Sequence, residues 1–238
     1  RVPPVVQVIS VDAMNTLIRP RSPIATTYAS VSRLYDVRIN ESKLASSFPK
    51  AFKSWSVREP CYGYDGRGAC EWWKGLVVSV IATSSVEEHS SRKLHLIAQH
   101  LYDLFASGSA WELVDPDAVS SLSRLRLKGI SLCIVSNFDS RLKSILSDLD
   151  LTDLFSMVLL SGELGFEKPD GRMFDTVKKY AELDDRKCLL HIGDDVDKDM
   201  KAALRWGARA LLFDATGKNE DNVGKENILR SFRDLHIY

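Results

Sequence analysis

The sequence predicts an α/β fold, in which a Rossmann-like parallel five-stranded sheet carries an α-helical domain inserted after its first strand. Three observations predict it. Short apolar, often β-branched runs alternate with longer amphipathic segments, which is typical of a parallel sheet covered by helices on both faces. A stretch of helical pattern interrupts this alternation after the first run. Polar residues directly follow the apolar runs, at the edge where open α/β sheets bind their ligands.

The first predicted strand covers residues 5–11 and ends at Asp12. Four longer segments with a helical pattern follow it, at 23–36, 41–57, 69–84 and 86–106. Few strand candidates lie among them. We therefore expect a helical domain over 21–111, inserted into an α/β core domain that is formed by 1–20 and 112–238.

Beyond residue 114 the alternation of strands and helices begins again. Strands are predicted at 130–135, 157–160, 188–192 and 208–213. Helices are predicted at 115–128, 139–149, 171–183 and 197–206. Gly129 and Gly207 stand directly after two of these helices, where glycine commonly ends a helix.

The composition describes an ordinary folded chain. Its 238 residues include 32 basic and 32 acidic side chains, so the formal net charge is zero, and 45% of the residues are hydrophobic. This balance excludes wholesale disorder and gives no reason to expect a nucleic acid or a membrane as partner. The longest strongly apolar stretch, 76–82, is far shorter than the roughly 20 residues of a membrane span.

The four cysteines indicate the compartment. They stand at 61, 70, 133 and 188, without the close spacing of a zinc site, and a chain of this length needs no disulfide to build a core. We therefore expect a reducing compartment. Because the sequence shows no export signal, the cytoplasm is the first expectation and the nucleus the second.

Reactive residues stand at the predicted strand ends. Asp12 follows the first strand, and Ser136 and Asn137 follow the second. Lys168 lies in the loop after the third strand, and Asp194 follows the fourth, with Asp199 five residues later. Each residue alone has an equally good structural explanation, since Asp commonly caps helices and acidic residues suit helix N-termini. All of them together at strand ends form a far more specific pattern.

This set of residues predicts phosphoryl chemistry. Asp12, Asp194 and Asp199 could gather the hard oxygen ligands that Mg²⁺ prefers. A carboxylate beside the ion can attack phosphorus and form an aspartyl-phosphate. Lys168 and the Ser136 hydroxyl would then balance the charge on the phosphoryl oxygens. The expected ligands are Mg²⁺ and a small phosphorylated metabolite.

The same residues resemble the four motifs of the haloacid dehalogenase superfamily. The motifs are Asp12-x-x-x-Thr16-Leu17, Ser136-Asn137, Lys168-Pro169 and Gly193-Asp194-x-x-x-x-Asp199. The resemblance spans nearly the whole chain and includes a helical cap inserted after the first motif. Residues 60–63 with Trp72-Trp73, and residues 163–170, resemble one narrower group within the superfamily.

The resemblance implies a role for each matched position. Asp12 would be the nucleophile and a metal ligand, and Met14 would be a metal ligand through its backbone carbonyl. Ser136 and Asn137 would bind phosphate, as would Lys168, which also belongs to the catalytic set. Asp194 would bind Mg²⁺ directly, whereas Asp199 would act in the outer shell or through water.

Position 14 departs from the pattern of the superfamily's phosphatases, which usually carry Asp two residues after the nucleophile. That Asp protonates the leaving group and then helps to activate water. Met14 cannot transfer a proton, and general acid–base assistance is typically worth about 10²–10⁴-fold in rate. The sequence therefore predicts a slow enzyme, or one limited to acyl or aryl phosphates, unless Asp195 or Asp65 supplies a base.

Two other functions stay open beside a Mg²⁺-dependent phosphohydrolase. Met14 is compatible with a binding or regulatory protein that keeps the phosphate site but turns nothing over. It is also compatible with a metal-independent haloacid dehalogenase, whose ester intermediate forms without phosphate. The retained Asp194, Asp195 and Asp199 favour Mg²⁺, and therefore place the dehalogenase third.

The loop 63–68 is the best candidate for substrate recognition, because binding residues often stand on loops that a rigid scaffold positions. Tyr64 and Arg67 are its candidate residues, and Trp72 is a third candidate on the following helix. His191 lies inside an apolar strand and is expected to be a buried, hydrogen-bonded core residue. The sequence does not determine the oligomeric state.

Overall fold

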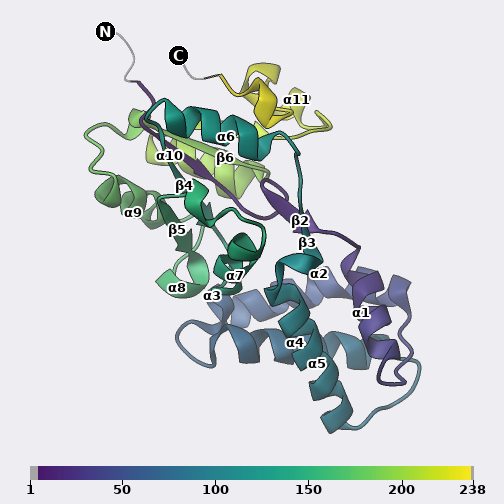
Figure 1. Ribbon diagram of the computed structural model, residues 1–238. Coiled ribbons are helices and arrows are strands. Elements are labelled where there is room, and N and C mark those ends of the chain that lie inside the picture. The colour runs from purple at the N-terminus through teal and green to yellow at the C-terminus, as the bar shows by residue number, and fades with distance from the viewer. Residues whose placement is uncertain (1–4, 237–238) are drawn as a thin grey trace.

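The computed structural model describes residues 5–236, so the ends of the predicted core domain, 1–4 and 237–238, lie outside the described residues. Its centre is a parallel sheet of six strands in the order β5-β4-β1-β6-β7-β8 (Figure 1). The strands are β1 (Val8–Val11), β4 (Ser131–Ser136), β5 (Met157–Leu160), β6 (Leu189–Gly193), β7 (Arg209–Phe213) and β8 (Ile228–Leu229). The predicted α/β class and parallel sheet are confirmed. The pattern does not predict β8, because two residues are too few to show a period.

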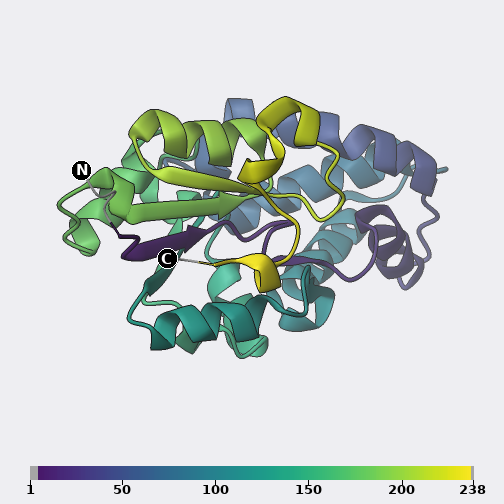
Figure 2. The same cartoon turned by 90° about the horizontal axis from the view of Figure 1, so that it is seen from above.

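Helices cover both faces of this sheet, as Figure 2 shows from above. Side chains alternate between the two faces along each strand. In β1, for example, Ile9 and Val11 join the hydrophobic cluster under α6 and α7, whereas Val8 joins the cluster under α9 and α10. The helices of this part are α6 (Ala118–Leu127), α7 (Arg141–Asp148), α8 (Ser161–Leu164), α9 (Arg172–Tyr180), α10 (Ala202–Trp206) and α11 (Glu220–Val223).

Shorter turns complete this part of the chain. Five are 3₁₀ turns, namely η1 (Gly108–Ala110), η2 (Thr152–Leu154), η3 (Arg186–Cys188), η5 (Lys225–Asn227) and η6 (Phe232–Asp234). The sixth, η4 (Val196–Lys201), is a π-helical turn that runs directly into α10. The single helix predicted at 197–206 is therefore two elements, and the wider turn lies beside the predicted acidic residues. Such π-helical turns are frequent at functional sites.

A second group of helices, the helical insert, lies beside the sheet (Figure 1). It comprises α1 (Ile24–Arg33), α2 (Glu41–Arg58), α3 (Pro60–Gly63), α4 (Gly68–Ser84) and α5 (Ser91–Ala106). These helices share a hydrophobic cluster that is distinct from the two clusters at the sheet. The predicted helical stretch is thus present, and the short helix α3 leads into the predicted loop 63–68, while the division into two domains stays a prediction.

Helix α4 is the centre of the insert, because it packs against both α2 and α5. Its buried face carries Trp72, Leu76 and Val80, which follow the four-residue spacing of one helix face. Gly75 lies between them, and a Cβ there would overlap the ring of Trp55 on α2. The absence of a side chain at this position therefore lets α2 and α4 approach closely.

Two antiparallel strands, β2 (Ile18–Pro20) and β3 (Trp111–Leu113), join the insert to the sheet. Arg19 and Glu112 form an ion pair across them, with 2.8 Å between Nε and Oε1. The chain leaves the core through β2 and returns through β3, so both connections are held side by side.

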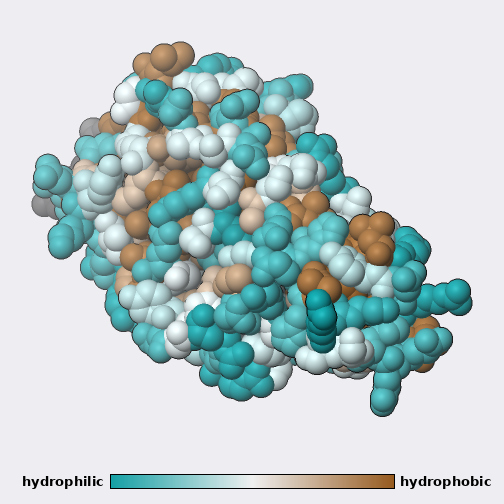
Figure 3. All heavy atoms as spheres, turned by 60° about the horizontal axis from the view of Figure 1, so that its bottom comes forward, coloured by the Kyte–Doolittle hydropathy of each residue, from teal (hydrophilic) through white to brown (hydrophobic). Residues whose placement is uncertain are grey.

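The face of the molecule seen in Figure 3 is mainly hydrophilic. On the face seen in Figure 3, hydrophobic residues form small patches that hydrophilic residues separate. The exposed large hydrophobic side chains are spread over several elements and include Leu34, Leu96, Leu127 and Leu204. Within residues 5–236, no helix combines the length and the apolar character needed to cross a bilayer.

We predict that Trp72→Ala lowers the free energy of unfolding by about 3–5 kcal/mol, because the Trp72 side chain is 0% exposed and its loss leaves a cavity inside the insert. Urea titration followed by circular dichroism measures the change. Leu127→Ala is the control, since Leu127 is 88% exposed and its truncation should change stability by less than about 0.5 kcal/mol. Equal effects of the two substitutions would contradict the described packing.

Candidate functional site

The strand order brings the predicted residues to one edge of the sheet. Strand β1 pairs in parallel with β4 on one side and with β6 on the other. Asp12 follows β1, Ser136 ends β4, and Asp194 follows β6, so all three stand at neighbouring carboxyl ends. This is the edge at which open α/β sheets bind ligands.

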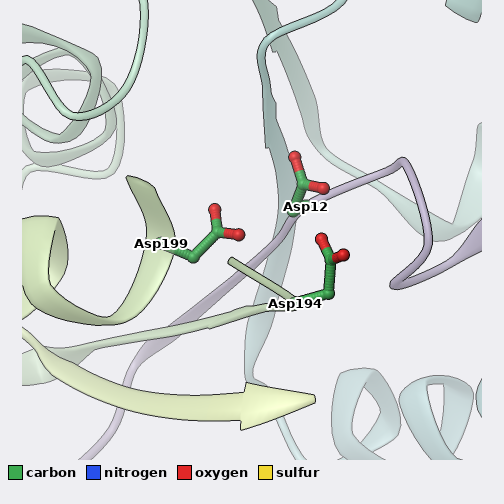
Figure 4. Close-up of side chains that lie close together, drawn as sticks. All are labelled: Asp12, Asp194 and Asp199. Carbon is green, nitrogen blue, oxygen red and sulfur yellow. The ribbon is translucent and has the colours of Figure 1, made fainter. Parts of the chain in front are cut away.

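Three carboxylates meet at this edge, as Figure 4 shows. Asp12, Asp194 and Asp199 each offer an oxygen atom, and these atoms lie within 4.8 Å of one another. Asp199 comes from η4 and reaches back over the end of β6. A Cβ at Gly193 would overlap the side chain of Asp199, so only glycine leaves room for that carboxylate.

Lys168 places one positive charge among the carboxylates. Its side chain is only 2% exposed. Its Nζ donates to Asp12 Oδ1 at 2.7 Å, to Asp199 Oδ1 at 2.5 Å and to the carbonyl oxygen of Val135 at 2.7 Å. All three ammonium protons are therefore engaged, and the ammonium group is fixed in position.

Asn137 holds the loop that carries Lys168. Its Nδ2 donates to the carbonyl oxygen of Lys168, and its Oδ1 accepts from the backbone N–H of Lys168, both at 2.8 Å. Both ends of the side-chain amide of Asn137 are therefore occupied, and its predicted role in binding phosphate stays a prediction. Its side chain acts as a positioning group for Lys168.

The electrostatics of the cluster are unbalanced toward negative charge. Burial raises the pKa of Asp194 to about 6, and the charges of Asp12 and Asp199 add to this effect. Burial also raises the pKa of Asp12, although Lys168 opposes it. For Asp199, burial acts in the same direction, but Lys168 and His191 outweigh it and lower the pKa. Burial alone would lower the pKa of Lys168, yet the two carboxylates raise it, so the ammonium keeps its proton.

His191, on β6, orients the carboxylate of Asp199. It is a buried, hydrogen-bonded residue, as expected, and its Nε2 lies 3.0 Å from Asp199 Oδ1 while its Nδ1 lies 2.7 Å from the Ser10 hydroxyl. An ionised carboxylate only accepts, so Nε2 carries the proton, and Nδ1 accepts from Ser10. Burial lowers the pKa of His191, which keeps the ring neutral at pH 7.

The apolar pattern of β6 does not predict the contact between His191 and Asp199, although the sequence carries a signal for it. Ser10 and His191 are directly paired across β1 and β6. Both are polar residues in otherwise apolar strands, and each stands two positions before a residue of the site, Asp12 or Gly193. Two polar residues in matching positions of neighbouring buried strands predict a hydrogen bond between them.

The hydroxyl group of Ser136 is buried and has no hydrogen-bond partner within residues 5–236. Buried hydroxyl groups in proteins nearly always have a partner, so an exception of this kind needs an explanation. Ser136 lines the same cavity as the carboxylates. Its hydroxyl group is therefore available to an oxygen atom of a bound ligand.

The site opens into a cavity of about 530 Å³ between the sheet edge and the helical insert. Its floor includes seven of the predicted site residues, namely Asp12, Met14, Ser136, Asn137, Lys168, Asp194 and Asp199. The structure thus gathers the whole predicted constellation. Asp195 also lines the cavity, whereas Asp65, the other candidate base, does not.

The three residues predicted to contact substrate from the insert do not line the cavity. Trp72 is wholly buried in the insert, and its neighbour Trp73 lines the cavity instead. Consecutive helical residues point in different directions, so the sequence alone cannot tell which of the two faces the site. Tyr64 packs its ring against Gly165, and Arg67 forms an ion pair with Glu59 at 2.6 Å.

Comparisons with known proteins agree with the geometry. The family profile described as haloacid dehalogenase-like hydrolase matches residues 6–207. Haloacid dehalogenase-like hydrolase domain-containing protein 3 from Bos taurus is 32% identical over 94% of this chain and 90% of its own length. The Homo sapiens protein of the same name is 29% identical over 97% of this chain and 92% of its own length.

Solved structures share the fold at low sequence identity. The putative HAD-hydrolase YfnB from Bacillus subtilis bound to magnesium has a TM-score of 0.68 at 16% identity, covering 97% of this chain and 96% of that chain. L-2-haloacid dehalogenase from Xanthobacter autotrophicus has a TM-score of 0.65 at 14% identity, covering 96% of each chain. A predicted phosphoglycolate phosphatase from Haemophilus somnus 129pt has a TM-score of 0.63 at 18% identity, also covering 96% of each.

We predict that Gly193→Ala lowers the free energy of unfolding by about 1–3 kcal/mol, because the added methyl group overlaps the side chain of Asp199 and displaces it from Lys168. Thermal and urea denaturation measure the loss. Gly66→Ala is the matched control, since a Cβ there has nothing within 4 Å. A Gly193→Ala protein as stable as the control would show that Asp199 does not approach the strand as described.

Proposed function

Because this chain belongs to the haloacid dehalogenase-like hydrolase family, we propose that it is a Mg²⁺-dependent phosphohydrolase that acts on a small organic phosphate through an aspartyl-phosphate at Asp12. One observation carries the proposal. Three carboxylates, one fixed ammonium group and one unpartnered buried hydroxyl group share a single cavity floor. These are the groups that a divalent cation and a phosphoryl group require.

The carboxylates fit a divalent cation. Asp12, Asp194 and Asp199 carry three carboxylates against the single charge of Lys168; burial raises the pKa of Asp194 most, and the charges of Asp12 and Asp199 raise it further. Asp12 and Asp194 would hold the ion, with Asp199 behind them and the Met14 carbonyl as a further ligand. When bound, Mg²⁺ would polarise the phosphoryl group and offset its negative charge.

Asp12 would perform the first step. Lys168 engages Oδ1 of Asp12, which leaves Oδ2 as the attacking atom. A bond forms between Oδ2 and phosphorus, and the ester bond breaks with its electron pair moving to the leaving oxygen. Lys168 keeps its proton and the Ser136 hydroxyl donates to a phosphoryl oxygen, so both stabilise the charge that develops there.

Water would complete the reaction. It attacks the phosphorus of the aspartyl-phosphate, and the bond to Asp12 breaks with its electron pair moving to the carboxylate. Both hydrogen atoms of the water end on the inorganic phosphate, one on the oxygen that attacked and one transferred to a phosphoryl oxygen. Asp195 lines the cavity, but its Oδ1 accepts from the backbone N–H groups of Asp197 and Lys198 as a helix cap. Met14 lines the cavity too and has no proton to give, so the leaving group departs without an acid from this position.

Met14 also favours a second candidate function, a protein that binds a phosphorylated metabolite without turning it over. Every group that would hold phosphate is present, and only the acid is missing. A metal-independent dehalogenase is a weaker candidate, because such chemistry needs no cluster of three carboxylates.

We predict that Asp12→Asn lowers the release of inorganic phosphate from acyl and aryl phosphates in the presence of Mg²⁺ by about 10³-fold or more, because the nucleophile is lost.

We predict that Met14→Asp raises turnover of alkyl phosphates by about 10²–10⁴-fold, because it restores a group that can protonate the leaving oxygen. A colorimetric phosphate assay measures both variants beside the wild-type protein.

The three proteins distinguish the candidate functions. Wild-type turnover that Asp12→Asn abolishes supports the phosphohydrolase. A wild-type protein that releases no phosphate, beside a Met14→Asp variant that does, supports the function of a binding protein. Chloride release from a 2-haloacid in the presence of EDTA would support the dehalogenase and contradict the proposal.

We predict that Mg²⁺ stabilises the protein more at pH 7 than at pH 5. The pKa of Asp194 is raised to about 6 in the folded protein, above that of an unfolded chain. Below a pH of about 6, the folded protein therefore binds a proton at Asp194 more tightly than the unfolded chain does. This contribution to the stability of the metal-free protein is lost as the pH rises through about 6. Melting temperatures with and without Mg²⁺ at both pH values measure the difference. Asp194→Asn should remove most of it, and an unchanged difference in that variant would contradict the role of Asp194.

A further inference from the structure

The cavity above the phosphate site is lined by aromatic rings from the helical insert. They include Tyr28 on α1, Phe48 and Phe52 on α2, Trp73 on α4 and Phe105 on α5. Among the described residues, the lining that α1–α5 provide contains no charged side chain and no carboxamide. A leaving group that occupies this space therefore meets ring faces and aliphatic groups.

Hydrogen-bonding groups on this side of the cavity are few. Tyr28, Tyr62 and Tyr102 carry the hydroxyl groups of the insert that face it. The Tyr62 hydroxyl donates to the carbonyl oxygen of Asn137 at 2.7 Å and is therefore already engaged. A sugar, polyol or nucleoside would lose its hydrogen bonds to water here and find too few in exchange, which costs free energy for each unpaired group.

Arg141 on α7 also lines this cavity, and it is already paired. Its Nε and Nη2 donate to the two carboxylate oxygens of Asp139, at 2.8 and 2.7 Å. Its guanidinium group lies 4.6 Å from the ring centre of Trp73 and 4.8 Å from that of Tyr102. Asp139 balances its charge, so Arg141 offers no free positive charge to a second anionic group on the ligand, whereas Lys198 on η4 also lines the cavity.

Position 14 independently restricts the leaving group. Without an acid there, the leaving oxygen must depart as an anion. A phenol has a pKa near that of tyrosine, about 10, whereas an aliphatic alcohol is closer to water, about 15.7. A phenolate therefore leaves far more readily than an alkoxide when no proton is supplied.

The two observations lead to the same chemical class. We infer that the substrate is an aryl phosphate, a monoester whose aromatic ring carries the ester oxygen. This inference rests on the proposed phosphohydrolase. The aromatic lining binds the ring, and the phenolic oxygen makes the acid at position 14 unnecessary.

Four substrates separate the two parts of the inference. Phenyl phosphate has a ring and a good leaving group, and benzyl phosphate has a ring and a poor one. Acetyl phosphate has a good leaving group without a ring, and glycerol 3-phosphate has neither. Phosphate release is measured for each with Mg²⁺, and the Asp12→Asn protein gives the background.

We expect the highest kcat/KM for phenyl phosphate. Its kcat should exceed that of benzyl phosphate by about 10²-fold or more, because only the alkyl ester needs the missing acid. Calorimetry on the Asp12→Asn protein measures binding apart from turnover. Phenyl and benzyl phosphate should bind at least about tenfold more tightly than glycerol 3-phosphate, as expected for burial of one ring.

A matched pair of variants tests the aromatic lining. Phe48→Leu should weaken binding of benzyl phosphate by about 2- to 10-fold, the size expected for the loss of one aromatic contact, and leave glycerol 3-phosphate unchanged. Tyr35→Leu is the control, because Tyr35 is an aromatic residue of the same insert that contacts His100 and does not line the cavity. Melting temperatures verify that both variants fold.

Failure of the inference is distinguishable from failure of the proposed function. Turnover of acetyl phosphate with equal kcat for phenyl and benzyl phosphate, or with binding of glycerol 3-phosphate as tight as that of benzyl phosphate, would overturn the inference and keep the phosphohydrolase. Absence of turnover for all four substrates, in the wild-type and Met14→Asp proteins alike, would overturn the phosphohydrolase, and with it the assignment of a substrate.

Discussion

The buried ammonium group of Lys168 is the contact on which the rest of the site depends. It joins Asp12, at the end of β1, to Asp199, on the turn after β6. A third hydrogen bond, to the carbonyl oxygen of Val135, fixes the position of the ammonium group. Removing one partner from a buried ion pair typically costs about 3–5 kcal/mol, because the remaining charges stay buried without compensation. The surrounding residues serve this contact: Asn137 fixes the loop that carries Lys168, and the bare backbone of Gly193 gives Asp199 its space.

The parallel sheet supplies the stiffness that such a contact needs. Strands β4, β1 and β6 lie next to one another inside the sheet, and side chains pack on both faces of the sheet. A residue directly after such a strand is held in place by the strand, so a short polar side chain there is enough to reach the site. The helical insert contributes differently, because its own cluster holds its helices together and only one side of it faces the cavity. The core thus fixes the reacting groups, and the insert determines what can lie above them.

The sequence predicts the core of the site better than its surroundings. Asp12, Ser136 and Asp194 stand at the ends of recognisable apolar runs, so strand ends alone bring these three together. The bonds of Asn137 and the contact between His191 and Asp199 depend on how separate elements pack, which the periodicity of one element does not contain. The choice between Trp72 and Trp73 fails for the same reason, since the orientation of α4 follows from its packing against α2 and α5. Tyr64 and Arg67 lie on a loop close to the core, yet their side chains meet Gly165 and Glu59 rather than the cavity.

Met14 affects the two halves of the proposed reaction unequally. In the first half, a leaving group that is stable as an anion makes an acid unnecessary, so the nature of the substrate can compensate for the residue. In the second half, the leaving group is the carboxylate of Asp12 itself, whatever the substrate was. This half therefore depends on activation of the attacking water. The apolar rings of the insert strengthen the electrostatic interactions of Lys168 and the carboxylates but provide little help in activating the water that must enter. On this chemistry, the missing acid would slow the hydrolysis of the aspartyl-phosphate more than its formation, so we expect the proposed phosphorylated form to last longer than in a Met14→Asp variant.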